Sequence, residues 1–392
     1  MTAVRYETAR CAAMLFFITP GLSYGLFTSR LPFFKMATGA EQSDIGLLLL
    51  TLGAASVVGL VLASAVIPRF GIRSVLVPGL FGQLMALVAA GTATTLVFLI
   101  ATFAFLGIFI GLTDVAMNQQ GLELERRFHK PTMGTLHAGY AIGGILGSLL
   151  GALFARLDIG PFLNFLLPAA GLGLALFWAI QHILEISRSD KKEEKAPKEK
   201  LPWLLFFTGG LVFLAFEAEG ACGDWGSLFL VKDKGATESA AALTYGTLTA
   251  AALVSRLTAD RLRGRTGDFS LLFAGAGVAL MGIVLVLAAS ETVSALTGFA
   301  LAGLGLGPIV PMLYSLTGKM ADVSSARASS VLSLMGYSGL LFCPPLYGWV
   351  AQYWDYPMIF VGVIVMLTLL VIGLDVVRRR FSQSSDECDG MR

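Results

Sequence analysis

The stretch Ser187–Lys200 reads SRSDKKEEKAPKEK and differs from everything around it in this 392-residue chain. Almost every side chain in it is polar, so it can neither enter a bilayer nor build a core. Six long apolar runs precede it and six follow it. The stretch therefore predicts a linker, residues 187–201, between an N-terminal bundle of residues 1–186 and a C-terminal bundle of residues 202–392.

The composition is that of a membrane protein. Hydrophobic residues make up 56% of the chain and charged residues 14%, and the mean hydropathy is +0.76. Soluble domains carry about 25% charged residues, so this chain lacks the polar surface of a water-soluble fold. Each apolar run can form a spanning helix of about 20 residues, which predicts an all-α integral membrane fold with twelve transmembrane helices. The predicted spans are Cys11–Leu31, Ile45–Ile67, Val75–Ala93, Leu96–Met117, Met133–Leu157, Phe162–Ile183, Trp203–Leu230, Ala240–Leu257, Phe269–Ala289, Ser294–Leu316, Ala328–Tyr353 and Pro357–Val377.

Basic residues are distributed unevenly between the two sides of this predicted topology. If both termini are cytoplasmic, all but five of the 28 lysines and arginines fall on the cytoplasmic side, with Arg256 counted among them. This asymmetry is the positive-inside pattern, and it predicts cytoplasmic N- and C-termini and a cytoplasmic linker. The five exceptions are Arg30, Lys35, Arg156, Lys232 and Lys234.

Several classes of function have no support in the sequence. The four cysteines show no paired spacing, so neither a disulfide framework nor a metal site is indicated. The nucleotide-binding pattern G-x-x-x-x-G-K-[ST] and the zinc pattern H-E-x-x-H are absent from the sequence. We therefore expect no enzymatic activity, no cofactor beyond a proton gradient and no nucleic-acid partner.

A weak repeat relates the two halves. Residues Pro68–Arg73 (PRFGIR) follow the second predicted span, and residues Asp260–Arg265 (DRLRGR) follow the eighth. Parallel repeats of this kind build many transporters, whose substrate site lies at mid-membrane between the halves.

The six-plus-six plan, the polar middle stretch and these two turns resemble the major facilitator superfamily of transporters. The turn motif of that superfamily reads roughly G-x-x-x-D-R-x-G-R-[RK]. Asp260 and Arg261 match it, whereas Pro68 replaces the acid in the first half. The resemblance implies transport by alternating access, with Asp260 and Arg261 as gate residues.

Shorter segments resemble two branches of the superfamily. Thr28–Pro32, Leu136–Tyr140 and Glu219–Trp225 are similar to the YbjJ-like bacterial inner-membrane proteins, which implies an inner-membrane location. Gly111–Asn118 resembles helix 4 of the proton-coupled fucose permease group, where an acid and an Asn four residues later take part in proton coupling and sugar binding. That group has a further acid in helix 1 that this chain lacks, so its sugar specificity does not carry over.

Asp114 lies inside the fourth predicted span, with Asn118 one helical turn further along the same face. An unpaired carboxyl at mid-bilayer costs about 2.5–3.5 kcal/mol, and intramembrane acids usually face a cavity or a pathway. We predict that Asp114 is the main proton-coupling group and that Asn118 binds substrate. The alternative is that Asp114 only braces a helix contact.

Two further titratable residues are candidates for the same process. We expect His137 at a depth close to Asp114, where it relays protons or binds substrate. The alternative is a neutral histidine satisfied by a backbone carbonyl. Glu219, in the seventh span, is predicted to be a second proton-coupling acid, and the role of Glu217 is left open.

Residues near the outer side suggest a gate and a binding surface. Arg30 is predicted to pair with Asp224 or Glu219 as an outer gate, the alternative being that Arg30 and Asp224 are ordinary interfacial residues. Tyr24 follows a Pro20-Gly21 step and Tyr337 precedes Pro344-Pro345. We expect a helix break at each step and assign both tyrosines to substrate binding, although tyrosines in membrane helices more often pack.

Glycines recur at four-residue spacing in the fifth span and predict close helix packing. The span lacks the Gly-Pro step of the superfamily's antiporter motif, which favours symport over exchange. The glycines are Gly139, Gly143, Gly147 and Gly151.

These observations together predict a monomeric secondary transporter that moves a small polar solute, such as a sugar or related metabolite, by proton symport. Its only expected partners are that solute and membrane lipids. Two alternatives stay open at this stage. One is a proton-coupled exporter of drug-like or amphipathic metabolites, and the other is a polytopic membrane protein that binds a ligand without transporting it.

Overall fold

The computed structural model describes residues 5–130, 132–184, 202–317 and 325–389, and within these ranges every regular element is a helix. The expected linker, residues 187–201, lies outside the described residues. The N-terminal helices are α1 (Tyr6–Ser29), α2 (Leu31–Thr38), α3 (Gln42–Phe70), α4 (Arg73–Ala90), α5 (Leu96–Phe128), α6 (Met133–Arg156), α7 (Pro161–Ala179) and the short η1 (Ile180–His182). The C-terminal helices are α8 (Trp203–Lys234), α9 (Glu238–Ala241), α10 (Leu243–Thr266), α11 (Asp268–Ala288), α12 (Thr292–Leu306), α13 (Ile309–Thr317), α14 (Ser325–Trp354) and α15 (Pro357–Asp389).

The all-α membrane fold is confirmed. Eleven stretches of the described chain are helical, long and apolar enough to cross a bilayer. The expected eighth span corresponds to α10, which is less apolar because it carries several polar side chains, Arg256 among them. It packs against α6, α8 and α12, and Arg256 forms an ion pair with Glu219 of α8.

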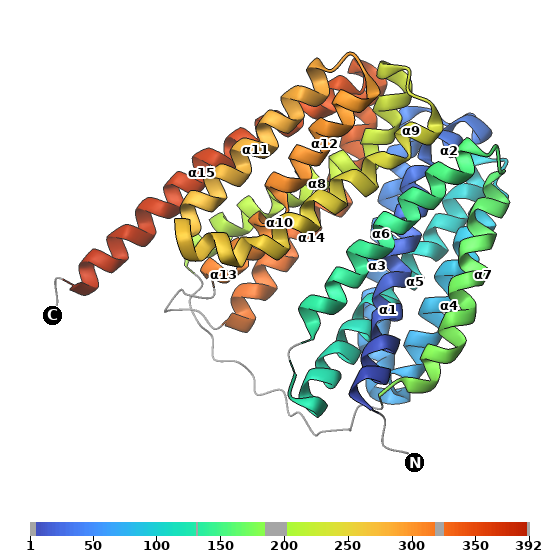
Figure 1. The fold of residues 1–392 in the computed structure, drawn as a ribbon, viewed down its shortest axis with the longest axis horizontal. Helices are drawn as coiled ribbons and strands as arrows, with labels where there is room; N and C mark the ends of the chain where they lie inside the picture. The colour runs from blue at the N-terminus through green and yellow to red at the C-terminus, as the bar shows by residue number, and fades with distance from the viewer. Residues whose placement is uncertain (1–4, 131, 185–201, 318–324, 390–392) are drawn as a thin grey trace.

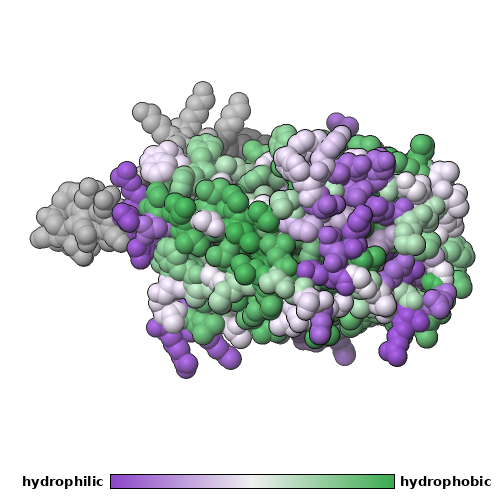
Figure 2. Space-filling view, turned by 90° about the horizontal axis from the view of Figure 1, so that it is seen from above, coloured by the Kyte–Doolittle hydropathy of each residue, from purple (hydrophilic) through white to green (hydrophobic). Residues whose placement is uncertain are grey.

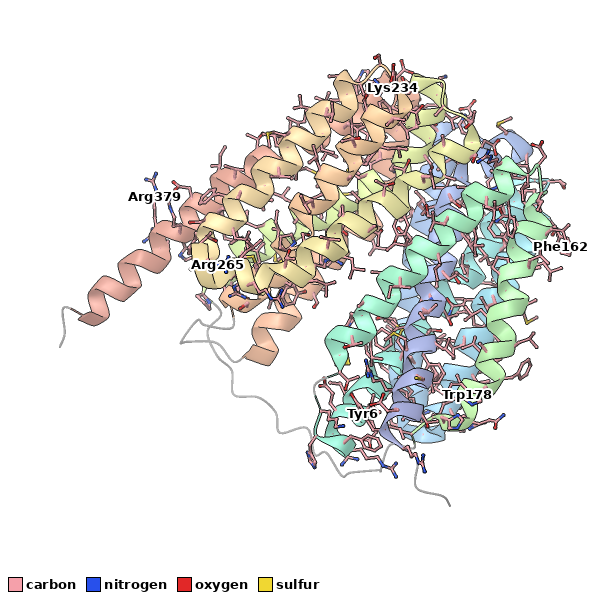
Figure 3. The ribbon with its side chains drawn as sticks, in the orientation of Figure 1. Tyr6, Phe162, Trp178, Lys234, Arg265 and Arg379 are labelled. Carbon is pink, nitrogen blue, oxygen red and sulfur yellow. The ribbon has the colours of Figure 1, made fainter. Side chains whose placement is uncertain are left out.

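The helices form two bundles that touch at one end (Figure 1). One bundle contains α1 and α3 to α7, the other contains α8 and α10 to α15, and they meet through the pairs α3–α14 and α6–α10. We call the end that carries α2, α9 and Lys234 the closed end. The end that carries Tyr6 and Arg265, where the bundles spread apart, is the open end (Figure 3).

The flanks of the bundles are apolar. Figure 2 shows the closed end from above, with hydrophilic residues gathered on the right and a broad hydrophobic surface over the slanted C-terminal bundle on the left. Large exposed apolar side chains occur on helices of both bundles, and such surface needs lipid or another apolar partner to cover it. Examples are Val61, Phe105, Leu174, Met281 and Leu369.

Glycines set the spacing inside the N-terminal bundle, as the four-residue pattern predicted. A Cβ atom on Gly143 would overlap the carbonyl oxygen of Ile18, and one on Gly147 would meet that of Leu22 at 2.5 Å. Because neither glycine has a side chain, α6 lies directly against the backbone of α1.

The two halves share a turn, which in the second half comes later than the sequence repeat placed it. Gly71 ends α3 with φ of 84°, and Gly267 ends α10 with φ of 83°. Both angles are in the left-handed region that glycine tolerates best. The predicted second turn at residues 260–265 is wrong, because α10 continues through Gly264 to Thr266. Across this turn, Arg263 of α10 binds Asp268 of α11 at 2.7 Å.

The predicted helix breaks are also wrong. Pro20 lies inside the continuous helix α1, and Pro344 and Pro345 lie inside α14. Gly21 has a packing role instead, since a Cβ there would overlap the Tyr140 carbonyl oxygen of α6.

Candidate functional site

A hydrogen bond joins the two bundles between α1 and α8. The Tyr24 hydroxyl of α1 donates to Asp224 Oδ1 of α8 at 2.7 Å. Asp224 is 9% exposed, and the ring of Tyr245 from α10 lies 5.2 Å from the Tyr24 ring, centroid to centroid. A carboxyl group, two tyrosines and both bundles therefore meet at one place.

Small side chains and short hydrogen bonds hold the closed end beyond this point. Ser148 Oγ of α6 donates to the Ala242 carbonyl oxygen at 2.5 Å and accepts from the Gly246 amide at 3.0 Å. Ser227 Oγ of α8 donates to the Thr28 carbonyl oxygen at 3.2 Å. Because the partners are mostly backbone groups, the helices of the two bundles lie very close together here.

A second tie at the closed end joins α3 and α14. Gln352 Nε2 donates to Glu41 Oε2 at 2.8 Å, and the Gln42 amide donates to Gln352 Oε1 at 3.1 Å. A Cβ atom on Gly46 would stand 2.6 Å from the Pro344 carbonyl oxygen, so these helices also touch through backbone. Glu41, Gln42 and Gln352 were not singled out from the sequence, because polar groups at helix ends look like ordinary loop residues.

Arg30 belongs to the closed end, but its predicted partners are wrong. It is 4% exposed in the turn between α1 and α2, and its nearest acid is Glu238 of α9, 3.4 Å away. Burial lowers the pKa of Arg30, whereas the charge of Glu238 raises it. The guanidinium also lies over the Phe33 ring at 5.2 Å. Asp224 bonds to Tyr24 instead, and Glu219 lies deeper.

Glu219 is paired with a basic residue from within the membrane. Arg256 Nη2 of α10 lies 3.1 Å from Glu219 Oε1 and 3.3 Å from Oε2, and Arg256 Nε donates to the Gly307 carbonyl oxygen at 2.9 Å. Arg256, which the charge count placed on the cytoplasmic side, therefore lies along the middle of α10. Glu219 is about 24 Å from Trp203 and about 22 Å from Lys234 along α8, which puts the pair near mid-membrane.

Glu217 points into the C-terminal bundle, away from Glu219. It is 6% exposed, and a Cβ atom on Gly339 of α14 would overlap its carboxyl group. The Tyr347 hydroxyl donates to the Glu217 carbonyl oxygen at 3.3 Å. These contacts give Glu217 a place in the α8–α14 packing.

Asp114 and Asn118 lie together on one face of α5. Asn118 Nδ2 donates to the Asp114 carbonyl oxygen at 2.8 Å and to its Oδ1 at 3.3 Å. Gly111 contacts the backbone of α3, and Gly121 contacts side chains of α6. Each residue is rotated by about 100° about the helix axis from the one before it, so the side chain of Asp114 projects between the directions of Gly111 and Gly121. Since α3 and α6 are the helices that meet the C-terminal bundle, the face of Asp114 points towards that bundle.

Asp114 is half-buried, and its electrostatic setting differs from that of Glu219. Within the residues that the structure describes, no basic side chain forms an ion pair with Asp114. Its described side-chain partner is the neutral amide of Asn118. A carboxyl group in such a setting can exist with or without its proton, because no fixed cation commits it to the charged form.

His137 lies nearer the open end than expected. Gly121, seven residues or about 10 Å beyond Asp114, contacts Leu136 of α6. The depth prediction that placed His137 beside Asp114 is therefore wrong. The exposed His137 ring meets Phe17 edge-on at 5.1 Å and lies within electrostatic range of Arg256. It lies on α6 where this helix packs against α1 and faces α10.

The remaining predicted residues lie at the open end or outside the described part. Arg261 is exposed near the end of α10. The side chains of Asp260 and Tyr337 lie outside the described part of the chain, so their predicted gate and substrate roles stay predictions.

Comparison with known protein families and sequences gives consistent matches. The model of the Major Facilitator Superfamily matches residues 13–339. An uncharacterized MFS-type transporter of Yersinia pestis is 28% identical over 362 residues, covering 91% of this chain and 92% of the relative. The membrane protein MosC of Rhizobium meliloti is 28% identical over 346 residues, covering 88% of this chain and 84% of the relative.

Solved structures match the fold over nearly the whole chain. A bacterial homologue of the human lysosomal transporter Spinster, in an inward-facing and unoccupied conformation, has a TM-score of 0.75 at 14% identity and covers 98% of this chain and 99% of that one. The nucleoside transporter NupG has a TM-score of 0.72 at 13% identity, with 95% and 98% covered. At these identities the likeness concerns the fold alone.

Proposed function

The chain belongs to the Major Facilitator Superfamily of transporters, and from this membership we propose that it moves a small polar solute by proton-coupled symport. The relatives are transporters or membrane proteins, not enzymes. In the proposed topology both termini are cytoplasmic in a bacterial inner membrane, because most basic residues lie at the open end. The closed end then faces outwards, and the structure is the inward-open state of an alternating-access cycle.

The hydrogen bond from Tyr24 to Asp224 carries the proposal. It joins the two bundles at the inner boundary of the closed end, so it must break before that end can open. The hydrogen bonding of the Asp224 carboxyl group therefore depends on whether the closed end is shut or open. Gain of a proton or contact with a polar solute at this position would favour one conformation over the other.

The polar groups around the centre take different parts in this proposal. Asp114 has no described cationic partner, so it is the proposed proton carrier, with Asn118 as a hydrogen-bonding group beside it. Glu219 is already balanced by Arg256, and this pair offers both a donor and an acceptor to a polar solute. His137 lies on the path from the open end and would meet the solute first. The Glu219–Arg256 ion pair and the carboxyl group of Asp114 suit a hydrophilic solute better than an apolar one.

The test is uptake into proteoliposomes. A panel of radiolabelled sugars and related metabolites is screened with and without an imposed pH gradient, and any transported solute is then used for variants. We expect Asp114→Asn to abolish accumulation driven by the pH gradient while solute counterflow continues. Asp158→Asn, which removes a carboxyl group from the exposed turn between α6 and α7, is the matched control and keeps both activities.

Each outcome separates one reading from another. If the Asp114→Asn variant still accumulates solute under a pH gradient with the wild-type pH dependence, Asp114 is not the proton carrier. Proton-driven extrusion of amphipathic dyes, without uptake of polar solutes, would favour the exporter. Solute binding without counterflow of any kind would contradict transport itself.

A further inference from the structure

The carboxyl groups inside the spanning helices outnumber the basic side chains that balance them. Four acids lie within α5 or α8, away from the helix ends: Asp114, Glu217, Glu219 and Asp224. Among the described residues, Glu219 is paired with Arg256, and no basic side chain forms an ion pair with the other three acids. A buried charge without a partner is costly, so this arrangement favours a positively charged ligand over a negatively charged one.

Asp224 has one carboxylate oxygen engaged and one available. Its Oδ1 accepts from the Tyr24 hydroxyl at 2.7 Å. Its Oδ2 accepts no hydrogen bond from the described residues, yet it is not fully buried. Because both oxygens of a carboxylate accept hydrogen bonds, Oδ2 is open to a donor from a ligand.

Two tyrosine rings stand beside this carboxyl group. The Tyr245 ring lies 5.2 Å from the Tyr24 ring, centroid to centroid, and both tyrosines are partly exposed. Gly144 of α6 and Gly223 of α8 leave room for Tyr245, since Cβ atoms on them would stand 2.9 and 3.2 Å from its ring. The face of a tyrosine ring attracts cations. A carboxylate beside two such rings matches an organic ammonium group.

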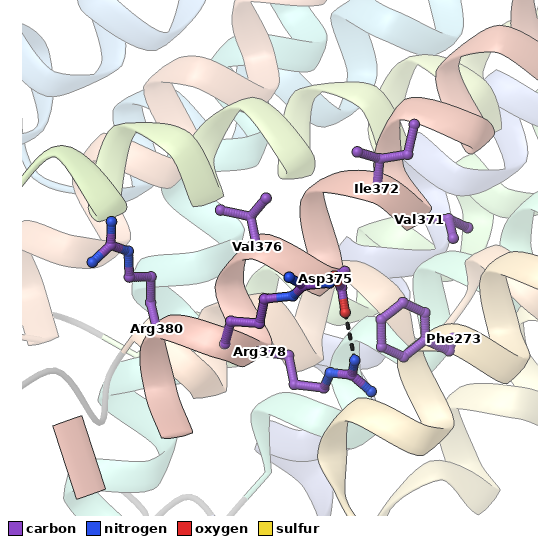
Figure 4. A pocket seen from close by; sticks show the side chains of 8 residues that line it. Phe273, Val371, Ile372, Asp375, Val376, Arg378 and Arg380 are labelled. Carbon is purple, nitrogen blue, oxygen red and sulfur yellow. Dashed lines mark hydrogen bonds and ion pairs between the residues drawn. The ribbon is translucent and has the colours of Figure 1, made fainter. Parts of the chain in front are cut away.

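Open space adjoins Asp224 on the side of the open end. Gly220 lies one turn before Asp224 on nearly the same side of α8, and this helix ends at Lys234, at the closed end (Figure 3). No atom of another helix lies within 4 Å of the position of a Cβ on Gly220. The site is separate from the pocket of about 820 Å³ between α11 and α15, whose lining residues belong to neither α8 nor α10 (Figure 4).

We propose that the transported solute carries a protonated amino group, which binds Asp224 Oδ2 beside the rings of Tyr24 and Tyr245. The inference rests on the proposed transport of a polar solute, and narrows that solute to a small organic cation such as an amino sugar or an amino alcohol. Its hydroxyl groups meet the Glu219–Arg256 pair, which lies about 7.5 Å nearer the open end along α8. Asp114, in the other bundle, keeps its proposed part as the proton carrier.

Other occupants fit these groups less well. A metal ion such as Ca²⁺ takes six or more oxygen ligands, and the described residues contain no cluster of three His, Cys, Asp or Glu side chains that could hold one. A neutral sugar would leave the carboxylate of Asp224 without a charged partner, and an anion would be repelled by it. A protonated amine supplies both the missing charge and the N–H donors.

The first experiment measures binding without transport. The melting temperature of the full-length protein in detergent is recorded with glucosamine and ethanolamine, and with the uncharged compounds glucose, N-acetylglucosamine and N-acetylethanolamine at equal concentration and ionic strength. We expect at least one amine to raise the melting temperature while its uncharged counterparts do not, because a ligand that binds only the folded state stabilises it. Stabilisation by the uncharged compounds to the same degree, or by no compound at all, would overturn the proposal.

Counterflow of the same compounds in proteoliposomes separates this inference from the proposed function. An amine that binds but is not exchanged across the membrane would support the site and contradict transport. Counterflow of uncharged solutes that Asp224→Asn leaves unaffected would support transport and contradict the site.

The second experiment tests the carboxyl group with matched variants. Tyr24→Phe deletes the hydrogen bond to Asp224 and keeps the charge, whereas Asp224→Asn removes the charge. We expect amine binding by Asp224→Asn to be at least about tenfold weaker than by Tyr24→Phe, because a hydrogen bond to a charged group is lost. Asp233→Asn, at the exposed end of α8, is the control and should bind as the wild type does. Equal binding by Asp224→Asn and Tyr24→Phe, or an equal loss in the control, would contradict the site.

The rings and the open space have variants of their own. Tyr245→Leu removes an aromatic face and should weaken amine binding roughly 2- to 30-fold, whereas Tyr245→Phe keeps the face and should bind nearly as the wild type does. Gly220→Leu places a side chain in the open space and should weaken binding without lowering the folded yield. Wild-type binding by both Tyr245→Leu and Gly220→Leu would show that the amino group does not bind here.

Discussion

Removal of the Tyr24 hydroxyl is the sharpest test of how the closed end is held. Tyr24→Phe keeps the ring that lies 4.6 Å from Phe27 and 5.2 Å from Tyr245, so packing is conserved. The change deletes only the hydrogen bond to Asp224, and leaves that buried carboxyl without its donor from the other bundle. The perturbation is therefore confined to one contact between the bundles.

The magnitude follows from the kind of hydrogen bond that is lost. A hydrogen bond to a charged group contributes about 1.5–3 kcal/mol net. The bond from Tyr24 to Asp224 spans the two bundles, so it forms only while the closed end is shut. Its loss should shift the equilibrium between the two ends by roughly 10- to 150-fold towards the state in which this end is open.

The assay is a distance distribution across the closed end. Spin labels or fluorophores are placed at Met36 on α2 and Lys232 on α8, both exposed, after replacement of the exposed Cys11. Tyr24→Phe should increase the population with the longer distance. The control is Tyr347→Phe, which deletes a hydroxyl that bonds the Glu217 carbonyl oxygen within one bundle. That variant should lower thermal stability by about 1 kcal/mol and leave the distance distribution unchanged.

A wild-type distribution for Tyr24→Phe, or a shift towards the shorter distance, would show that this hydrogen bond does not hold the closed end shut. A double-mutant cycle with Asp224→Asn adds a quantitative condition. Groups in direct contact usually show coupling energies of about 0.5–3 kcal/mol, whereas independent groups are additive. Additivity of the two changes would mean that the bond at 2.7 Å does not govern the gate.

Three further outcomes follow from the contacts of single residues. Gly46→Leu should shift the same distance distribution towards the longer distance, because its side chain would enter the backbone contact between α3 and α14. Breaking a fully buried ion pair costs roughly 3–5 kcal/mol, and Arg256→Gln should destabilise the protein by less because Arg256 is 40% exposed. Adding Glu219→Gln should recover most of the lost stability in thermal melts, because it removes the carboxylate that the first change leaves unpaired. Gly143→Leu should cost roughly 3 kcal/mol or more and reduce the folded yield in size-exclusion profiles, because it overlaps the Ile18 carbonyl oxygen and forces α6 off α1.

The fold was predictable because the membrane restricts the choices that the chain has. A segment that crosses lipid must be helical and about 20 residues long, so apolar length alone identifies most spans. The glycine stripe on α6 was equally readable, since four-residue spacing of glycine has one common use between helices. The boundaries of α10 were not readable, because its many polar side chains reduce the apolar signal.

The partners of the polar residues were mostly beyond the sequence. Arg30 and Asp224 lie at similar distances along α1 and α8, which made an ion pair reasonable, yet Arg30 is in a turn and reaches α9 instead. Arg256 was missed as the partner of Glu219 because the apolar run ends one residue after it, at Leu257, although the helix continues to Thr266. Pairing depends on where each helix ends and how it is rotated, and one chain's pattern fixes neither.

The chemistry of the closed end suits a gate that must open again. Reversing a two-state equilibrium from 1:99 to 99:1 takes about 5.5 kcal/mol of differential binding. Each neutral tie of the kind that Ser148 makes with Ala242 and Gly246 contributes about 0.5–1.5 kcal/mol, and the bond from Tyr24 to Asp224 about twice that. A few such ties add up to a barrier that one solute and one proton can overcome. Apolar side chains of both bundles, Phe27 and Trp225 among them, belong to one buried cluster, so these hydrogen bonds are only one part of what must separate when the end opens.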